Sequence, residues 1–565
     1  MAQALSSAPQ TAHGETAHGD NGEIEETIEA AVGARWVPVV ALAELRSRGS
    51  KVVKVGRKQI ALFHGPHGEN GRVHACNNRC PHEGYPLAEG SLSEDQDSGH
   101  CVLTCNWHNW KFDLENGDNL TGGDALRRYP TRVEDGQVLV DVSDPPGEQR
   151  AAKALENLRD SLERYEVERM ARELARVQAA GAEPLDALRA AFAWTHERLE
   201  FGSTHAHAAA ADWLALRDRL SRDEAESLVP LVEILGNLSW DTLRERRFPF
   251  PEASARYDPA ALVAAIDRED EPAAVAQIRG ALDAGIGFAA LERPLAEAAL
   301  AHYQDFGHAA IYVQKTAELI DRLGPGVSEP LLLSLVRALI YAWREDLVPE
   351  FRSYADQLAR WDGKGTRKVT AEDFIGLDAK RAMALAVEAS KRPDALYDAL
   401  LGAAAWNWLH FDLHYQERTE GPISDNKSWL SFTHAVTFAN AVRWLCESTP
   451  ELWPAGLLQI ACFVGRNAGY SDAEITLEDW TVEAPLPWLD EQLRALFDHA
   501  EPEHIVVAHL VKTLTAVRAE IAAAPDAPWV PTLVAAMNRL LNSPIKRRHA
   551  LRAARQSLKF VALEG

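Results

Sequence analysis

The sequence predicts a multidomain protein in which a small all-β domain is followed by a large all-α domain. The chain has 565 residues, which is too many for one ordinary hydrophobic core. Short β-type runs with turn signals fill residues 36–142, whereas apolar residues recur with helical spacing after about residue 150. The linker Pro145-Pro146-Gly147 lies between these two textures.

Four segments follow from this division. Residues 1–32 are predicted to be a disordered leader, because they are rich in Ala, Gly, Glu and Thr with little periodicity. The β domain is expected at 33–145, a linker and amphipathic helix at 146–189, and the all-α domain at 190–565.

The strands of the first domain should include 52–55, 59–63, 72–75 and 135–142, with turns at 65–66 and 69–71. The expected helices lie at 152–179, 212–220, 224–238, 259–266, 294–323, 330–342, 378–388, 395–409, 432–445, 489–500 and 502–524.

The composition is typical of a soluble globular protein, with 46% hydrophobic and 25% charged residues. A net charge of −24 argues against nucleic acid or an anionic membrane as a partner. No apolar run is long enough for a transmembrane helix, and no secretory or twin-arginine signal is recognisable. We therefore expect a cytoplasmic protein.

Two short segments each combine a cysteine with a histidine: Cys80-Pro81-His82 and Cys105-Asn106-Trp107-His108. Two thiolates on one iron and two imidazoles on the other are what a [2Fe–2S] cluster of mixed ligation needs. The alternative is tetrahedral zinc, but zinc fingers usually pair Cys with Cys and His with His. The spacing therefore favours the cluster, held by Cys80, His82, Cys105 and His108.

The residues around these ligands resemble the two cluster loops of Rieske ferredoxins and Rieske oxygenases, over about residues 34–142. The first loop is Cys80–Leu87 and the second is Cys105–Asp113. Asn109 stands where the family usually has Gly, so the backbone there is expected to differ slightly. Tyr85 and Trp107 occupy positions where respiratory Rieske proteins carry an extra cysteine pair, so the likeness is to the soluble, lower-potential branch. The resemblance implies a small all-β Rieske domain.

Histidines of the helical part form a second group of candidates. Helical proteins that activate oxygen place His and carboxylate ligands on facing helices, and two His with one carboxylate suit Fe(II). For any single histidine the alternative is a hydrogen-bonded core residue or a helix-terminal cation. The catalytic candidates are His302, Asp305, His308, His410, His414, His434 and His504. The first three are spaced by three residues, which would place them on one face of a helix.

A second resemblance covers roughly residues 190–530. The segments 433–437 (Thr-His-Ala-Val-Thr) and 503–507 (Glu-His-Ile-Val-Val) are similar to the questin oxidase family, helical oxidases of polyketide pathways associated with Baeyer–Villiger-type ring cleavage. The resemblance carries over most directly to His434 and His504, and also to His205 and His308. The spacing Glu501, His504, His509 also echoes the iron motif of Rieske oxygenases, a match that we attribute to chance.

Three functions remain open. The first is an oxidoreductase whose cluster relays single electrons to a helical domain that oxidises or oxygenates an aromatic or polyketide-like substrate. This function includes a second non-haem iron and dioxygen. It also needs an external ferredoxin or flavin/NAD(P)H reductase as electron donor, because no G-x-G-x-x-G motif for a nicotinamide or flavin cofactor follows a strand in this chain. The second is a non-catalytic electron carrier or redox sensor with a helical docking scaffold. The third is a cluster that only holds the fold together.

Overall fold

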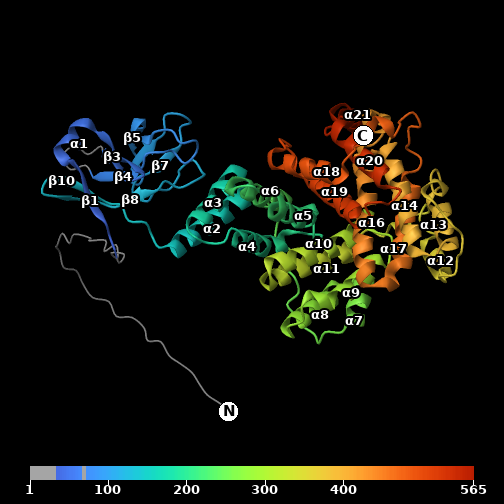
Figure 1. The fold of residues 1–565 in the computed structure, drawn as a ribbon. Coiled ribbons are helices and arrows are strands. Elements are labelled where there is room, and N and C mark those ends of the chain that lie inside the picture. Colours follow the sequence, from blue (N-terminus) through green and yellow to red (C-terminus); the bar gives the residue numbers. More distant parts are fainter. Residues whose placement is uncertain (1–32, 66–71, 565) are drawn as a thin grey trace, which may run out of the picture. The chain divides into compact units, whose positions relative to one another are not determined.

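The structure, a computed structural model, describes residues 33–65 and 72–564 (Figure 1). It forms two compact units that divide between Pro145 and Pro146, and each is considered by itself. The expected leader at 1–32 and the turn at 69–71 lie outside the described residues.

Antiparallel strands build the first unit, as expected. Its described strands form three sheets, with orders β1-β10-β9, β2-β3-β4-β8 and β5-β6-β7. Helix α1 (Leu42–Arg48) follows the first strand. The strands are β1 (Trp36–Ala41), β2 (Ser50–Val55), β3 (Lys58–His64), β4 (Val73–Asn77), β5 (Ser91–Glu94), β6 (Cys101–Thr104), β7 (Lys111–Asp113), β8 (Arg128–Tyr129), β9 (Thr131–Glu134) and β10 (Gln137–Asp141).

Strand β3 separates two small hydrophobic cores because its side chains alternate between its faces. Ile60 and Leu62 belong to one core, with Val138 of β10. Ala61 and Phe63 belong to the other, which also contains the two ligand cysteines Cys80 and Cys105. The sheet therefore anchors both cysteines in one apolar core.

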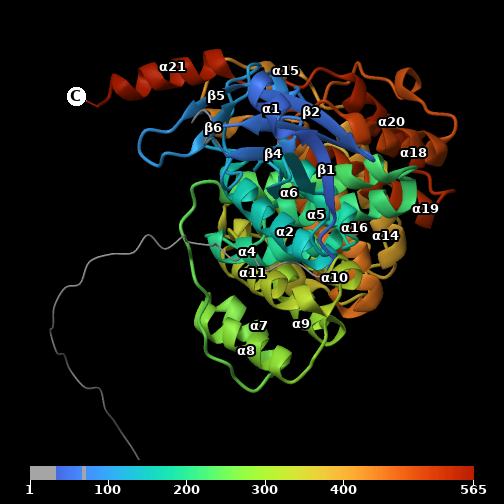
Figure 2. The same cartoon turned by 90° about the vertical axis from the view of Figure 1, so that its left-hand side faces the viewer.

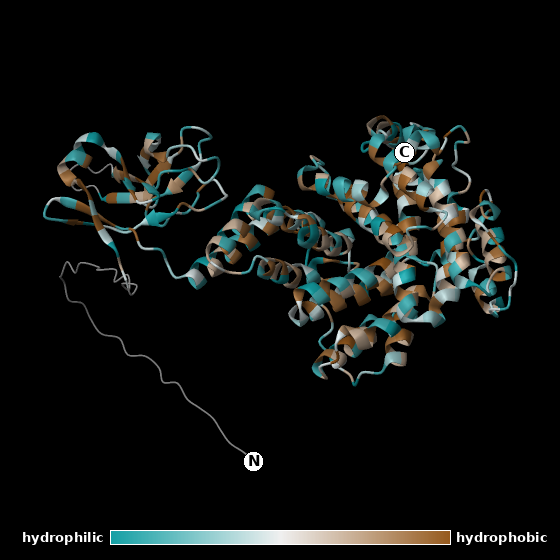
Figure 3. Ribbon diagram, viewed as in Figure 1, coloured by the Kyte–Doolittle hydropathy of each residue, from teal (hydrophilic) through white to brown (hydrophobic). Residues whose placement is uncertain are grey.

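Helices make up the regular structure described in the second unit. They are α2 (Gly147–Arg164), α3 (Val167–Ala179), α4 (Leu185–Thr195), α5 (His205–Leu220), α6 (Glu224–Thr242), α7 (Pro259–Asp267), α8 (Glu271–Asp283), α9 (Phe288–Leu300), α10 (His308–Leu323), α11 (Ser328–Tyr341), α12 (Tyr354–Arg360), α13 (Ala379–Glu388), α14 (Pro393–Leu409), α15 (His414–Glu417), α16 (Trp429–Ser448), α17 (Trp453–Asn467), α18 (Pro485–Ala495), α19 (His504–Ala523), α20 (Val530–Asn542) and α21 (Ala550–Val561). Hydrophobic and hydrophilic residues both occur along many of these helices (Figure 3).

Two expected helices are broken in the structure. The helix expected at 152–179 divides at Tyr165. Helix α2 ends there because Tyr165 has a left-handed backbone conformation, with φ of 58°. The helix expected at 294–323 divides between α9 and α10, because Asp305 and Phe306 both have positive φ in the short 3₁₀ turn η4 (Asp305–Gly307). Helical periodicity continues through both breaks, so the sequence pattern did not reveal them.

The stretch expected as a linker and helix, 146–189, instead forms α2, α3 and the start of α4. Their buried residues, including Leu158 and Leu174, belong to the large core of the second unit. Helices α2, α3 and α4 all pack on α6.

Four helices far apart in sequence form a closed ring. Helix α5 packs on α10, α10 on α16, α16 on α19, and α19 on α5. Bundles of this kind build sites from side chains on facing helices. Helices α7 and α8 lie side by side elsewhere in the unit (Figures 1 and 2). Within the described ranges, no helix combines the length and the apolar character needed to span a membrane.

Candidate functional site

The two loops that carry the ligand cysteines of the first unit have the same backbone geometry. In each loop the cysteine N–H donates to the carbonyl five residues later, and the cysteine carbonyl accepts from the N–H four residues later. These bonds measure 2.8–3.0 Å and join Cys80 to Tyr85 and Gly84, and Cys105 to Trp110 and Asn109. The shared turn holds the two cysteines in the same way, whereas His82 follows its cysteine by two residues and His108 follows its own by three.

The four expected cluster ligands face one another. Nδ1 of His82 lies 3.0 Å from Nδ1 of His108, and Cys80 and Cys105 lie in the same small hydrophobic core. Both cysteines are buried, whereas His108 is exposed. Burial raises the pKa of the Cys80 thiol to about 11. Two inward cysteines and two outward imidazoles are the donor set of a mixed-ligand [2Fe–2S] cluster, so these residues fit that group.

Asn109 takes the left-handed conformation that Gly84 takes at the matching position of the first loop. Its φ is 60° and that of Gly84 is 76°, in a region that Asn tolerates better than most residues. The turn around Cys105 therefore keeps the geometry of the turn around Cys80.

An aromatic side chain covers one imidazole. The ring of Trp110 stacks on that of His82, with centroids 4.5 Å apart and an interplanar angle of 15°. Gly123 makes room for this stack, since a Cβ there would lie 2.6 Å from the Trp110 ring.

In the second unit, one histidine from each helix of the ring meets at a common point. Nε2 of His308 lies 3.1 Å from Nε2 of His205 and 3.0 Å from Nε2 of His434. The ring of His509 is 4.7 Å from that of His205 and 5.0 Å from that of His434, measured between centroids. We call His205, His308, His434 and His509 the four-histidine site.

Backbone carbonyls orient three of these imidazoles. Each Nδ1 lies 2.6 Å from a carbonyl oxygen, and the pairs are His308 with Asp305, His434 with Leu430, and His509 with Ile505. A carbonyl only accepts, so Nδ1 carries the proton and Nε2 of each neutral ring is left with a bare lone pair.

The bare Nε2 atoms of His308 and His434 cannot hydrogen-bond to each other. Two nitrogens bound to one metal at about 2.0–2.1 Å, at angles between octahedral and tetrahedral, lie about 2.8–3.4 Å apart. The observed separations of 3.0 and 3.1 Å fall within this range. A backbone carbonyl on the second ring nitrogen is also the usual outer contact of metal-binding histidine. The arrangement of His205, His308 and His434 can therefore hold a divalent metal ion, with His509 beside them.

The electrostatics keep these imidazoles neutral. Burial lowers the pKa of His308 and of His509 to about 3, and lowers the pKa of His205 and His434 well below the usual value. The charge of the buried Lys512 adds to the effect. Burial also lowers the pKa of Lys512 to about 8, and its Nζ finds no hydrogen-bond partner within the described chain.

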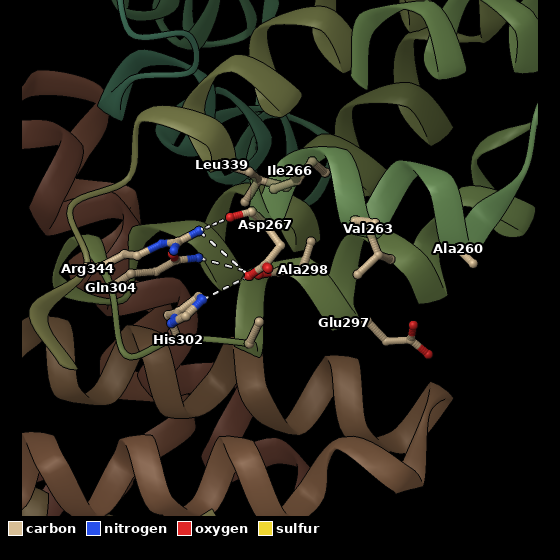
Figure 4. A pocket seen from close by; sticks show the side chains of 12 residues that line it. Ala260, Val263, Ile266, Asp267, Glu297, Ala298, His302, Gln304, Leu339 and Arg344 are labelled. Carbon is tan, nitrogen blue, oxygen red and sulfur yellow. Dashed lines mark hydrogen bonds and ion pairs between the residues drawn. The ribbon is translucent and has the colours of Figure 1, made fainter. Parts of the chain in front are cut away.

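The candidates predicted from the sequence divide between this site and other places. His308 and His434 belong to it, and Asp305 serves it through its backbone carbonyl. The expected single face of His302, Asp305 and His308 is wrong, because η4 interrupts the helix. His302 instead lies at a separate cavity of about 380 Å³, with Asp267 beside it (Figure 4).

Three further candidates also lie outside the four-histidine site. His410 stacks on Trp406 at 4.0 Å and bonds to its carbonyl, and the exposed His414 begins α15, so the two do not form a helical pair. His504 bonds to Tyr165.

The candidate list omitted His509 and Lys512. Both lie in α19 and are buried. The sequence did hold a signal for them: Lys512 follows His509 by three residues on an apolar helical face. Because lysine is seldom fully buried, a lysine on such a face points to a functional site. His207 caps its own helix through Thr204 and is not part of the site.

A cavity of about 240 Å³ opens beside His509. Its walls are largely apolar and include Trp429, while Thr513, Lys546 and Arg547 are among the polar residues that line it. The cavity offers apolar surface with a few polar groups, which is typical of a small-molecule site.

Comparison with known proteins identifies the first unit. Residues 35–130 match the family model of the Rieske [2Fe–2S] domain. Over 117 residues the chain is 33% identical to the ferredoxin component of the alkene monooxygenase system of Xanthobacter autotrophicus, covering 20% of this chain and 88% of that protein. It is 33% identical over 108 residues to the 3-phenylpropionate/cinnamic acid dioxygenase ferredoxin subunit of Photorhabdus laumondii, covering 19% and 93%. Identity to the 4beta-methylsterol monooxygenase of Methylococcus capsulatus is 31% over 124 residues, covering 20% of this chain and 31% of that protein.

Proposed function

Because the chain belongs to the Rieske [2Fe–2S] domain family through residues 35–130, we propose that it is an oxidoreductase with a catalytic helical unit. Cys80, Cys105, His82 and His108 hold the cluster, which when bound supplies one-electron transfer. The helical unit oxidises or oxygenates an organic substrate with electrons relayed to it. An external ferredoxin or flavin/NAD(P)H reductase is the electron donor.

The four-histidine site is the proposed reaction centre, with non-haem iron as its metal. The observation that carries this assignment is the approach of bare Nε2 atoms of His308 and His434 to 3.0 Å. Imidazole also suits zinc, copper and nickel. The electron-transfer domain in the same chain argues against zinc, which has no redox chemistry, and iron is the redox-active ion that we propose. The helices hold the neutral imidazoles in place and exclude water from them.

The cavity beside His509 is the proposed substrate site. Its apolar walls with Trp429 suit a flat aromatic or polyketide-like molecule, and the polar lining residues Thr513 and Lys546 suit carbonyl or phenol oxygens on it. Dioxygen is the proposed co-substrate. The resemblance to questin oxidases is part of this proposal, although His504 lies outside the four-histidine site.

A non-catalytic electron carrier is the second candidate. The ferredoxin components among the relatives favour it, since their own names describe carriers. None of the six cysteines, all of which the structure describes, forms a disulfide, which suits a reducing, cytoplasmic location under either proposal.

Iron and acid-labile sulfide per chain, measured on anaerobically purified protein, test the assignment. An enzyme should contain two sulfides and three irons, and His434→Ala should remove one iron while leaving the reduced-cluster EPR signal unchanged. His410→Ala, which lies outside the four-histidine site, is the matched control. Two irons in the wild type, unchanged in His434→Ala, would favour the carrier. Oxygen consumption with aromatic substrates then distinguishes an active site from a stored metal.

A further inference from the structure

A hydrogen-bonded network adjoins the four-histidine site on helix α19. The hydroxyl of Tyr165 lies 2.8 Å from Nε2 of His504, a contact that joins residues 339 positions apart. His504 is the first residue of α19 and precedes His509 by five residues, which is about 7.5 Å of helix rise. The proposed reaction centre does not use this pair.

The direction of each hydrogen bond follows from a backbone donor. The N–H of Glu501 donates to Nδ1 of His499 at 2.9 Å, so Nε2 of His499 carries a proton and faces Glu233 at 3.3 Å. Nδ1 of His504 lies 3.5 Å from the other oxygen of Glu233. Burial opposes ionisation of Glu233, but hydrogen bonds from both imidazoles lower its pKa to about 2. The carboxylate therefore holds the Nδ1 proton of His504, and Nε2 accepts from Tyr165.

The local backbone is built around this contact. Tyr165 has a left-handed φ of 58° at the break between α2 and α3, a conformation that costs energy for a residue with a bulky side chain. At Gly236 of α6, a Cβ would lie 2.7 Å from Cε1 of His504. A strained residue on one side and a space-making glycine on the other both position the Tyr165–His504 pair.

An exposed tryptophan connects the pair to the surface. The rings of Trp240 and Tyr165 are 5.3 Å apart between centroids, and Trp240 is 58% exposed. Its chain neighbour Asp241 accepts from Thr204 Oγ1 at 2.5 Å, and Thr204 directly precedes His205. Trp240 is therefore linked to the four-histidine site through Tyr165 and α19, and through Asp241 and α5.

We propose that Tyr165 is a redox-active residue that carries single electrons between Trp240 at the surface and the four-histidine site. In the oxidising step one electron leaves Tyr165 for a one-electron oxidant, an oxidised metal ion in that site. The phenol O–H bond breaks and its proton passes to Nε2 of His504. A neutral phenoxyl radical and an imidazolium facing Glu233 result. A one-electron donor at Trp240 restores the phenol, and the proton returns from His504.

This inference rests on the proposed function for its oxidant, so its test uses an external one. A ruthenium polypyridyl photosensitiser with an irreversible quencher oxidises the full-length protein in a light flash. EPR and transient absorption then report a neutral tyrosyl radical at neutral pH. We expect loss of this signal in Tyr165→Phe, and a strongly reduced yield in His504→Gln and Glu233→Gln, because the proton acceptor is removed or weakened.

Matched controls come from another part of the same unit. Trp343 is 64% exposed and Tyr341 is exposed beside Phe201, so Trp343→Phe and Tyr341→Phe should leave the signal unchanged. Trp240→Phe should slow radical formation. Circular dichroism melts establish that each variant is folded.

A radical signal that persists in Tyr165→Phe, or that is equal in His504→Gln and the wild type, would overturn the inference. Iron analysis separates this outcome from failure of the proposed function. A radical in protein that lacks the third iron supports the redox chemistry of Tyr165 but not the reaction centre. A protein that contains the third iron but forms no radical would support the proposed reaction centre and would rule out the electron relay through Tyr165.

Discussion

Nε2 of His434 lies 3.0 Å from Nε2 of His308, although the other nitrogen of each ring is bonded to a backbone carbonyl oxygen. Two lone pairs at this distance repel each other unless a cation lies between them. The fold thus holds a repulsive arrangement that a bound metal ion would relieve, and metal binding should then be visible as a gain in stability.

Chelation of the metal should therefore lower the melting temperature of the helical unit, followed by far-UV circular dichroism. At free metal of about 100 times the Kd, the loss amounts to about 2.7 kcal/mol. His434→Ala should melt at the same temperature with and without chelator, because its site is incomplete. His410→Ala should respond like the wild type. An equal chelator effect in His434→Ala would show that the metal lies elsewhere.

Lys512 should make metal affinity dependent on pH. Its pKa is lowered to about 8 by burial, with Asp212 raising it and Lys315 lowering it. Below pH 8 its positive charge repels the metal, so affinity should rise with pH and level off above pH 8, with a slope of up to about tenfold per unit below it. Isothermal titration between pH 6.5 and 9, values chosen to bracket that pKa, measures this profile.

Substitution separates this effect from general changes in charge. Lys512→Met should flatten the profile, whereas Lys153→Met at an exposed position should not alter it. A profile that keeps its slope in Lys512→Met would assign the titration to another group.

His302 should stabilise the second unit more in acid than in base. A hydrogen bond to Asp346 at 2.8 Å, and a second to Asp267 at 3.1 Å, raise the pKa of His302 above its usual value. The protonated form is favoured by folding, so this stability is fully present below pH 6.5, the unfolded value, and is lost as pH rises through the raised folded pKa.

In urea unfolding, His302→Gln should therefore cost about 1 kcal/mol at pH 5.5, a small value because solvent screens a partly exposed ion pair. The cost should be lower at pH 8.5, where less of the imidazole is protonated. The exposed His414→Gln should cost little at either pH. A pH-independent cost in His302→Gln would mean that packing, and not charge, holds the residue.

Gly123→Ala should disturb the cluster loops. The new methyl group would lie 2.6 Å from the Trp110 ring and displace it from His82. Overpacking of this kind costs about 1–3 kcal/mol, beyond the backbone strain of a positive φ. The visible circular dichroism of the cluster should melt at a lower temperature, and the reduction potential should shift.

Gly136→Ala is the control, because Gly136 also has positive φ but faces open space. It should show the strain alone, without a change in potential. Equal losses in both variants would mean that the Trp110 stack does not matter for the cluster.

The sequence by itself determined the fold class and predicted the cluster ligands. Cys80 and His82 lie within three residues, as Cys105 and His108 lie within four, so local turns decide their geometry and the spacing is enough to propose them as ligands. The backbone of Asn109 is also decided locally, because its left-handed conformation is part of the turn around Cys105. The change from alternating to helical periodicity likewise separates the two units, because it reflects the local pattern of burial.

Only the tertiary structure decided which histidines form the second site. His205 and His308 are 103 residues apart, and they meet because α5 packs on α10. Helical periodicity identifies an apolar face but not the helix that covers it, so His509 and His504 could not be told apart from sequence. His302 and His308 were grouped together because helical periodicity continues through the break at η4. The left-handed residues of η4 place the two histidines in different surroundings. Long-range packing is a property of all the helices together, and no local segment encodes it.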